Sequence, residues 1–300
     1  ALTMSYMVIQ NIVGVSGAMA MGLPKAMGIM AGSASLIGGH GTAIAWSGEI
    51  AANHGIPNAL EVGVAAATLG LVMASLLGGP VSKWLIQSFK LKGNSHASLS
   101  VGVSYENEDI EKIDHISLMR VTFIMHIAII IGYLLNDWIN AMGIKLPLFV
   151  SCLMVAIVLS NSVPLVLKNL PWPARTRALA TISDFSLGLF ISMSLMGMQL
   201  WTIADLASSL MTLIVLQAIT VILFIRFLLF PLMGRDYQAS VLSAGFAGFA
   251  LGATPTAIAN MSAVTKTHGP APTAFIILPL VGAFFVDLAN SFIIRYFLTL

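Results

Sequence analysis

Long apolar runs alternate with short polar stretches along most of the chain. Seven of these runs approach the ~20 residues that a helix needs to cross the hydrocarbon core of a bilayer, and they occupy 1–23, 58–80, 118–136, 146–165, 178–200, 208–230 and 271–298. The runs are apolar on every side, which is typical of membrane-spanning helices rather than of alternating strands. The pattern therefore predicts an all-α membrane protein with several spans.

Two further apolar segments, 27–53 and 237–266, are interrupted by glycine or proline. Residues 38–45 read Gly-Gly-His-Gly-Thr-Ala-Ile-Ala, and residues 252–259 read Gly-Ala-Thr-Pro-Thr-Ala-Ile-Ala. The shared tetrad lies 214 residues apart, and the same offset carries Gly38 onto Gly252 and His54 onto His268. Each arm is too short to cross a bilayer, so we expect two re-entrant hairpins that line a cavity. Interrupted segments at corresponding positions of two halves point to the substrate site of a secondary transporter.

Basic residues set the expected orientation. Lysine and arginine gather around 83–120, 168–177 and 226–235, whereas the intervening turns carry only Asp137 and Lys145, then Asp205. The positive-inside rule makes the three basic loops cytoplasmic. The hairpin 27–53 then enters from the outer face and the hairpin 237–266 from the inner face, so the predicted repeats are inverted.

The repeats define the expected domains. Residues 1–82 are interpreted as the remainder of the first inverted repeat, with two spans and the outer-face hairpin. Residues 83–117 are a cytoplasmic linker, and 118–300 are the second repeat, with five spans and the inner-face hairpin. Each repeat places its hairpin between its last two transmembrane helices. If the halves are equivalent, three more spans, about 80–100 residues, precede Ala1.

Composition narrows the function classes. The chain is 58% hydrophobic and only 9% charged, against about 25% charged residues in soluble domains. The net charge of +2 is thinly spread, so we expect no nucleic-acid partner. Histidine and acidic residues lack metal-ligand spacing, which predicts no transition metal, and hydrolase motifs are missing, so we do not expect an enzyme. The single cysteine, Cys152, is interpreted as a small packing residue.

The two hairpin tips supply the expected substrate site. Glycine lets backbone amides approach a ligand closely, and the start of a half-helix favours an anion. We expect these half-helices to begin at Thr42 and around Thr256, with Thr254 as N-cap and Pro255 early in the helix. The predicted substrate-binding residues are Ser35, Gly38, Gly39, His40, Gly41, Thr42, Gly252, Ala253, Thr254, Pro255, Thr256 and Asn260. The alternative is that small-residue helices merely pack closely.

Polar residues within the spans are candidates for a sodium ion or a substrate ammonium. Asp287, Asn290 and Ser291 share a helix face, and oxygen-rich groups of this kind suit a hard cation. Gln10, Asn11 and Asn161 are further candidates, with interhelical hydrogen bonding as the alternative. His40 is interpreted either as a donor to an anionic substrate or as a neutral histidine bonded within the tip. We expect the repeats to match in backbone but to differ in chemistry.

Three segments resemble the sodium/glutamate symporters, also called the glutamate:sodium symporter family. They are 35–42, 252–260 and 281–287, the last reading Val-Gly-Ala-Phe-Phe-Val-Asp, and the resemblance runs along essentially all 300 residues. It implies an inner-membrane homodimer that takes up glutamate with sodium as coupling ion and without a cofactor. The hairpins would meet from opposite sides, with elevator-like alternating access against a dimerisation scaffold. The related 2-hydroxycarboxylate carriers have a Gly-Gly-x-Gly turn in both hairpins, so Gly-Ala-Thr-Pro in the second favours the glutamate branch.

Other functions stay open at this point. Within the same class, the chain could carry another dicarboxylate with sodium. From different classes, the alternatives are an anion channel and an intramembrane enzyme. Saturable uptake that depends on a sodium gradient separates the carrier from both.

Overall fold

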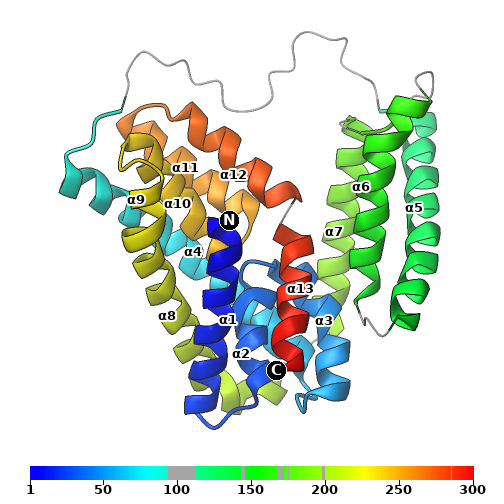
Figure 1. Ribbon diagram of the computed structural model, residues 1–300, viewed down its shortest axis with the longest axis horizontal. Helices are drawn as coiled ribbons and strands as arrows, with labels where there is room; N and C mark the ends of the chain where they lie inside the picture. The colour runs from blue at the N-terminus through cyan, green and yellow to red at the C-terminus, as the bar shows by residue number, and fades with distance from the viewer. Residues whose placement is uncertain (94–112, 143–145, 168–171, 175, 198–199, 285) are drawn as a thin grey trace. The chain divides into compact units, whose positions relative to one another are not determined.

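The fold is seen in a computed structural model, which describes residues 1–93, 113–142, 146–167, 172–174, 176–197, 200–284 and 286–300 (Figure 1). Contacts divide the chain into two compact units. The hairpin unit comprises Ala1–Ser104 with Met198–Leu300, and the three-helix unit is Tyr105–Gly197. These units do not follow the repeat boundaries expected from the sequence, and the predicted linker residues 94–112 lie outside the described residues.

All regular secondary structure within the described residues is helical. The hairpin unit contains α1 (Leu2–Ala20), α2 (Lys25–Ile29), the π-helix η1 (Met30–Ala34), α3 (Gly39–Asn53), α4 (Ala59–Phe89), the 3₁₀ helix η2 (Leu200–Leu206), α8 (Ala207–Phe224), the π-helix η3 (Ile225–Leu229), α9 (Phe230–Leu232), α10 (Tyr237–Leu251), α11 (Thr254–His268), α12 (Pro272–Phe284) and α13 (Val286–Thr299). The three-helix unit contains α5 (His115–Ala141), α6 (Leu148–Val166) and α7 (Arg177–Gly197).

Several helices are long and apolar enough to cross a membrane. Among the described residues they are α4, α5, α6 and the helical stretch Ala204–Leu232, and the pair α12–α13 is a fifth if it counts as one bent span. The chain is therefore a multi-pass helical membrane protein, as predicted. The segment expected as one span over 271–298 consists of two helices that bend by 50° at a break, which the sequence did not predict.

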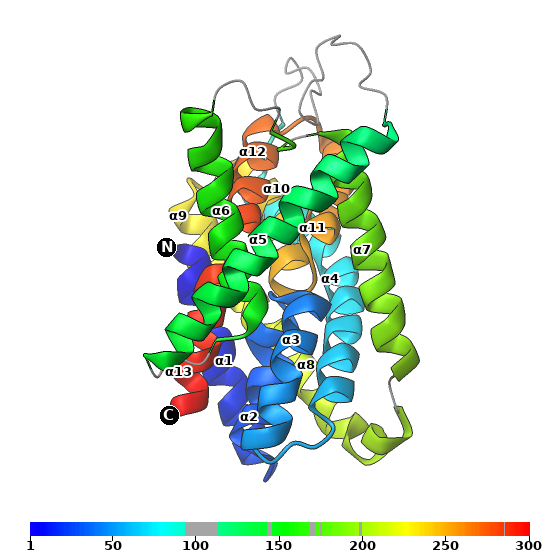
Figure 2. The same ribbon diagram turned by 90° about the vertical axis from the view of Figure 1, so that its right-hand side faces the viewer.

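In the hairpin unit, α2–α3 and α10–α11 form two helix pairs whose open ends lie at opposite ends of the unit (Figures 1 and 2). The long helix α4 contacts α3, α10 and α11. Gly70 in the middle of α4 allows this packing, because a Cβ there would collide with the Leu251 carbonyl of one pair and lie 2.5 Å from the Leu36 side chain of the other. Small residues let neighbouring backbones approach in this way.

The two helix pairs differ in backbone, which contradicts the expected match. Both second arms, α3 and α11, are continuous and 15 residues long. The first arm α10 is also continuous over 15 residues. The other first arm is split between α2 and η1, and Gly32 within η1 has non-helical dihedrals of φ −109° and ψ −130°. The positions of Ser33 and its neighbours can therefore not be inferred from the corresponding residues of the continuous helix α10.

The three-helix unit packs α5 against both α6 and α7. Cys152 of α6 contacts Gly132 of α5, where a Cβ would lie only 2.6 Å from the cysteine sulfur. The Ser151 hydroxyl donates a 3.0 Å hydrogen bond to Asn136 Oδ1 across the same pair of helices. The packing role predicted for Cys152 agrees with this contact.

Candidate functional site

The tips of the two helix pairs meet in the middle of the hairpin unit (Figure 2). Gly39 has a φ of +65°, and a Cβ placed on it would lie 3.8 Å from the Gly252 carbonyl oxygen of the other tip. Left-handed backbone is strained for residues with a side chain. Glycine at position 39 therefore serves both the turn and the close approach of the second tip.

Each tip begins a helix slightly earlier than the sequence predicted. Helix α3 starts at Gly39 instead of Thr42, and α11 starts at Thr254 with Ala253 as N-cap, so Thr254 is not the cap. Neither N-cap has a side-chain hydrogen bond. Gly39 can adopt the left-handed backbone at the start of α3. Pro255 has the backbone geometry of an early helical position in α11. Both helices therefore begin without a capping side chain.

The helix starts leave backbone donors at the tips. The N–H groups of a helix's first turn have no intrahelical partner. At the first tip these include Gly39, His40 and Gly41; at the second they include Thr254 and Thr256, since Pro255 has no N–H. Gly41 and Pro255 are exposed, and the others are half-buried. Two helix N-termini thus present donors and positive dipole ends in one neighbourhood.

Helices α12 and α13 each approach one of the two tips. Gly282 at the end of α12 approaches the second tip, where a Cβ would lie 3.0 Å from Thr254 Oγ1. Asn290 on α13 approaches the first tip: a Cβ on Gly38 would lie 2.9 Å from Asn290 Nδ2. The same amide nitrogen donates a 2.8 Å hydrogen bond to the Ser33 carbonyl. The bent helix pair therefore joins the two hairpins at their tips.

Two adjacent amides of α1 hold one hairpin each. Gln10 Nε2 donates to the Ala250 carbonyl at 2.9 Å, one turn before the second tip. Asn11 Oδ1 accepts from the Ser33 backbone N–H at 3.1 Å, beside the non-helical Gly32. Both side chains are completely buried. Gln217 of α8 donates to the Gln10 carbonyl at 2.8 Å, which fixes the backbone of this amide pair.

Several atoms of this cluster are buried without a hydrogen-bond partner. The oxygens are Gln10 Oε1, Ser33 Oγ, Ser35 Oγ, Gln217 Oε1 and Asn290 Oδ1, and the nitrogen is Asn11 Nδ2. Buried polar atoms are normally satisfied, so each unpaired one calls for an explanation. The three amide oxygens can only accept hydrogen bonds, the two serine hydroxyls can both donate and accept, and all five oxygens can bind a cation.

Some predicted site residues have other contacts. Asn260 Nδ2 donates to the Ala74 carbonyl of α4 at 3.0 Å and to the Ala244 carbonyl of α10 at 3.5 Å, which ties α11 to its neighbours. Asn161 belongs to the three-helix unit, is exposed, and donates to the Ile157 carbonyl of its own helix at 2.8 Å. The structure does not place Asn161 among the other candidates.

The predicted polar face of α13 divides. Asn290 and Ser291 are fully buried, whereas Asp287 is exposed. Asp287 lies in the first turn of α13, beside the break. The Ser291 hydroxyl donates to the Asp287 backbone carbonyl at 2.9 Å, so these residues are linked through the helix backbone.

His40 bonds to α4 and not within its own tip. Its Nε2 lies 3.1 Å from Thr68 Oγ1, and that hydroxyl donates to the Val64 carbonyl at 2.8 Å. Because the hydroxyl hydrogen of Thr68 is engaged, its oxygen accepts from Nε2–H of His40. The other ring nitrogen of a neutral His40 is then an acceptor.

Thr68, Ser33 and Gln217 were not predicted from the sequence as members of the site. Of these three, only Gln217 could have been suspected from the sequence, because it is an amide within an apolar run.

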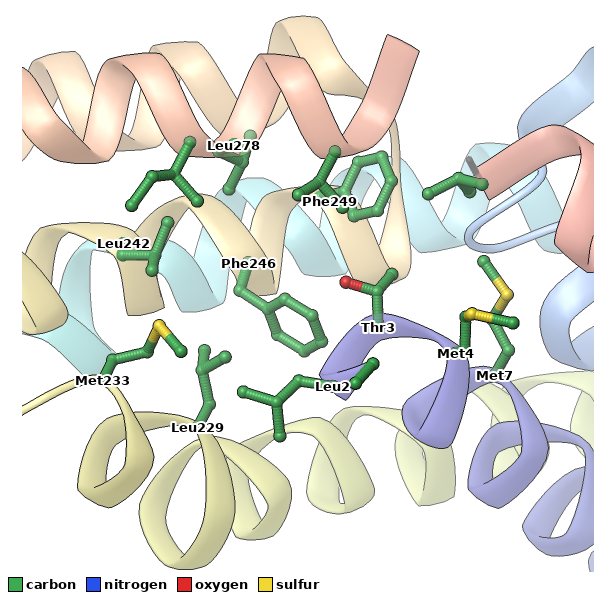
Figure 3. Close-up of a pocket in the computed structure, with 14 residues that line it drawn as sticks. Leu2, Thr3, Met4, Met7, Leu229, Met233, Leu242, Phe246, Phe249 and Leu278 are labelled. Carbon is green, nitrogen blue, oxygen red and sulfur yellow. The ribbon is translucent and has the colours of Figure 1, made fainter. Parts of the chain in front are cut away.

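A further cavity of the hairpin unit has an apolar lining. It measures about 550 Å³ and is lined by α1, α10, α12 and their neighbours, with Phe246, Phe249 and Leu278 among its walls (Figure 3). None of its lining residues is a predicted site residue, and Thr3 is the one polar side chain among them. A carboxylate in this apolar cavity would lose its hydration without compensation. The tips, and not this cavity, have the chemistry for an anion.

A multi-pass helical membrane protein whose polar groups gather where two hairpin tips meet a broken helix pair is, by class, a membrane transporter. A family model described as sodium/glutamate symporter matches residues 1–270. The chain belongs to the sodium/glutamate symporter family. This is a transporter family, so the chain is not an enzyme.

The relatives agree with the family assignment. The chain is 38% identical over 295 residues to the sodium/glutamate symporters of Escherichia coli K12 and Shigella flexneri, covering 98% of this chain and 73% of each relative. It is 36% identical over 290 residues to that of Haemophilus influenzae, covering 95% of this chain and 71% of the relative. No solved structure matches the chain.

Proposed function

We propose that this chain takes up glutamate together with sodium, and that glutamate binds between the two hairpin tips. The observation that carries the proposal is the approach of Gly39 to the Gly252 carbonyl, which brings two helix N-termini together. Glutamate has two carboxylates, and each helix start offers backbone donors to one of them. Asp287, exposed beside the tips' contact with α12–α13, is the acid that suits the substrate ammonium.

Sodium is proposed to bind at the polar cluster behind the first tip. Ser33 Oγ and Asn290 Oδ1 are buried, unpartnered oxygens. They belong to residues joined by the Asn290–Ser33 hydrogen bond. The backbone at Gly32 is non-helical, and backbone carbonyls of unwound helices coordinate sodium in other transporters. Gln10 and Asn11 are proposed to hold the hairpins in position, because Asn11 Oδ1 already accepts a hydrogen bond from the Ser33 N–H.

Coupling follows from this arrangement. A cation beside Ser33 and Asn290 would fix the backbone that leads to Gly38, and Gly38 N–H already donates to the Ser33 carbonyl at 2.9 Å. The first tip would then be ordered before the substrate binds, which raises the affinity for glutamate. By linkage, bound glutamate raises the affinity for sodium by the same factor.

The larger organisation is part of the proposal. The open ends of the hairpins lie at opposite ends of the hairpin unit, which supports re-entrant hairpins within inverted repeats, with the boundaries 1–82, 83–117 and 118–300. The separation into two compact units supports an elevator-like movement of the hairpin unit, with the three-helix unit as scaffold of a homodimer. The family resemblance supports an inner-membrane location for this dimer.

The test is uptake of labelled glutamate into proteoliposomes. We expect saturable uptake that requires an inward sodium gradient and that excess unlabelled glutamate abolishes. Uptake that ignores the sodium gradient would overturn the symport proposal. Flux that rises linearly with glutamate concentration would instead indicate a channel. Stronger competition by another dicarboxylate would indicate that this compound is the preferred substrate.

A further inference from the structure

An arginine is surrounded by aromatic rings on the side of the hairpin unit away from the tips. Arg226 lies in the π-helix η3, and its guanidinium carbon is 5.7 Å from the Trp84 ring centre, 5.3 Å from the Phe89 ring and 5.7 Å from the Phe227 ring. These distances lie within the ~6 Å range of cation–π contacts. Two rings come from the end of α4, so the cluster joins α4 to the α8–α9 span.

The rings fix the guanidinium but do not use its N–H groups. Among the described residues, Arg226 has ring contacts and no ion pair with a carboxylate. An aromatic ring offers no oxygen to a guanidinium N–H, so these contacts leave the donors able to bind an oxyanion. A cation inside a membrane-spanning stretch needs a counter-charge or access to the membrane boundary.

The surface around Arg226 is apolar at its rings and basic at its edge. Trp84 is 45%, Phe89 37% and Phe227 67% exposed. Lys83 and Lys90 are exposed at the same end of α4, and neither 81–92 nor 220–232 contains an acidic residue. Tryptophan and arginine gather at the depth where acyl chains meet headgroups. Arg226 lies six residues before the end of the α8–α9 span at Leu232, about 9 Å along the helix.

The interruption of the helix contributes to this geometry. Within η3, Ile225 and Leu229 are buried in the unit. Arg226 between them is half-buried, and the neighbouring Phe227 turns outward. Phe89 also packs against Phe230, with ring centres 5.0 Å apart, which holds the end of α4 in place. A π-turn shifts side chains relative to a regular helix and frequently marks a functional position.

We infer that Arg226, Trp84, Phe89 and Phe227 form a binding site for the phosphate headgroup of an anionic membrane lipid. The guanidinium donors bind the phosphate oxygens, Lys83 and Lys90 add charge at the rim, and the exposed rings contact the upper acyl chains. Charge complementarity selects an anionic over a zwitterionic lipid, because Lys83 and Lys90 adjoin the two α4 rings in sequence and neither 81–92 nor 220–232 contains an acid. This site is independent of the glutamate site at the tips.

The experiment measures lipid retention by the purified full chain. The chain is mixed with phosphatidylglycerol and phosphatidylcholine in equal amounts, and bound lipid is counted by native mass spectrometry. We expect the wild type to retain phosphatidylglycerol preferentially and Arg226→Gln to lose about fivefold or more of that preference. Arg235→Gln is the matched control, because it removes one exposed arginine nine residues on and should retain the preference.

Two further arms keep the result unambiguous. Trp84→Leu leaves the charge in place but removes one ring, and it should lower phosphatidylglycerol retention by a smaller factor than Arg226→Gln. Inorganic phosphate should not displace the lipid, because it lacks acyl chains for the rings. Equal retention by Arg226→Gln and Arg235→Gln, or equal retention of both lipids by the wild type, would overturn the inference. Sodium-driven glutamate uptake is measured separately, because it tests the site at the hairpin tips and not the lipid site.

Discussion

The hairpin unit and the three-helix unit treat polar side chains in opposite ways. Among the described residues, every fully buried polar side chain except Ser151 belongs to the hairpin unit. In the three-helix unit, only 17% of the most apolar stretch of α5, and of α6, is buried, against 50% for the Ala204–Leu232 span. A unit that buries few polar groups and exposes apolar faces suits contact with lipid or another subunit, whereas the other unit contains the candidate substrate and sodium sites.

This difference explains why composition alone does not locate a site. Both units are built from apolar helices of similar length. Among the described residues, the interrupted helices belong to the hairpin unit, where the breaks lie at Gly32, at the two tips, at η3 and between α12 and α13. Each interruption frees backbone donors and acceptors, which must be satisfied by buried side chains or by a ligand.

The largest expected effect is at the first tip. Gly38→Ala places a Cβ 2.7 Å from both the Ala34 carbonyl oxygen and Thr42 Cβ. Overpacking of this kind costs roughly 1–3 kcal/mol, and we expect glutamate uptake to fall by about tenfold or more. The control is Gly48→Ala in the same helix, where a Cβ meets nothing within 4 Å. Equal uptake by the two variants would contradict a close-packed tip.

The second effect concerns the amides that hold the hairpins. Asn11→Leu leaves the buried Ser33 N–H without its acceptor, which costs about 1–3 kcal/mol. Its counterpart in the three-helix unit is Asn136→Leu, which removes a half-buried acceptor from Ser151. We expect thermal unfolding and uptake to suffer more in Asn11→Leu. A larger loss of uptake in Asn136→Leu would contradict the assignment of the substrate site to the hairpin unit.

The third effect concerns cation dependence. Asp287→Asn removes the exposed acid that we assign to the substrate ammonium. Because glutamate and sodium binding are linked, we expect the sodium concentration for half-maximal uptake to rise about tenfold, ~1.4 kcal/mol. Asp184→Asn makes the same change on an exposed position of α7. It should leave the sodium dependence unchanged. Unchanged sodium dependence in Asp287→Asn would remove this residue from the site.

The smallest effect is at the entry to the three-helix unit. Asp114 caps α5 by accepting from Ser117 N–H at 2.7 Å, and this bond holds the pKa of the exposed carboxyl below its usual value. A lowered folded-state pKa means that the cap stabilises the helix above the ordinary carboxyl pKa and is lost as pH falls through the lowered one. Asp114→Ala should speed amide exchange in the first turn of α5 and leave uptake unchanged. Slower exchange or lost uptake would contradict a local capping role.

The sequence predicted the interrupted segments because glycine and proline act locally. Gly39 needs a left-handed backbone and Pro255 cannot continue a helix from before it, so both breaks were readable without tertiary information. The exact helix starts were not, because Gly39 and Thr254 begin helices that no side chain caps. The break near Phe284 and the π-turn η1 were also missed, since both depend on contacts with distant residues.

Amides within apolar runs show the same limit of prediction from sequence. Gln217 and Asn161 both lie in such runs, so the sequence alone does not indicate which of them is buried. Gln217 is buried and holds the Gln10 carbonyl, whereas Asn161 is exposed and bonds its own helix. Which side of a helix packs against protein is decided by the neighbouring helices. An apolar run that is hydrophobic all round carries no periodicity to predict it.

Cysteine protection tests the central claim most directly, because it asks whether both tips face one substrate. In a Cys152→Ala background, single cysteines are introduced as Gly41→Cys and Thr256→Cys, with Gly48→Cys as the control on the same helix as Gly41. Maleimide labelling is timed with sodium alone and with sodium plus glutamate. Our account predicts that glutamate slows labelling at both tips and leaves position 48 unchanged. Protection at only one tip, or at neither, would contradict a shared site between the hairpins.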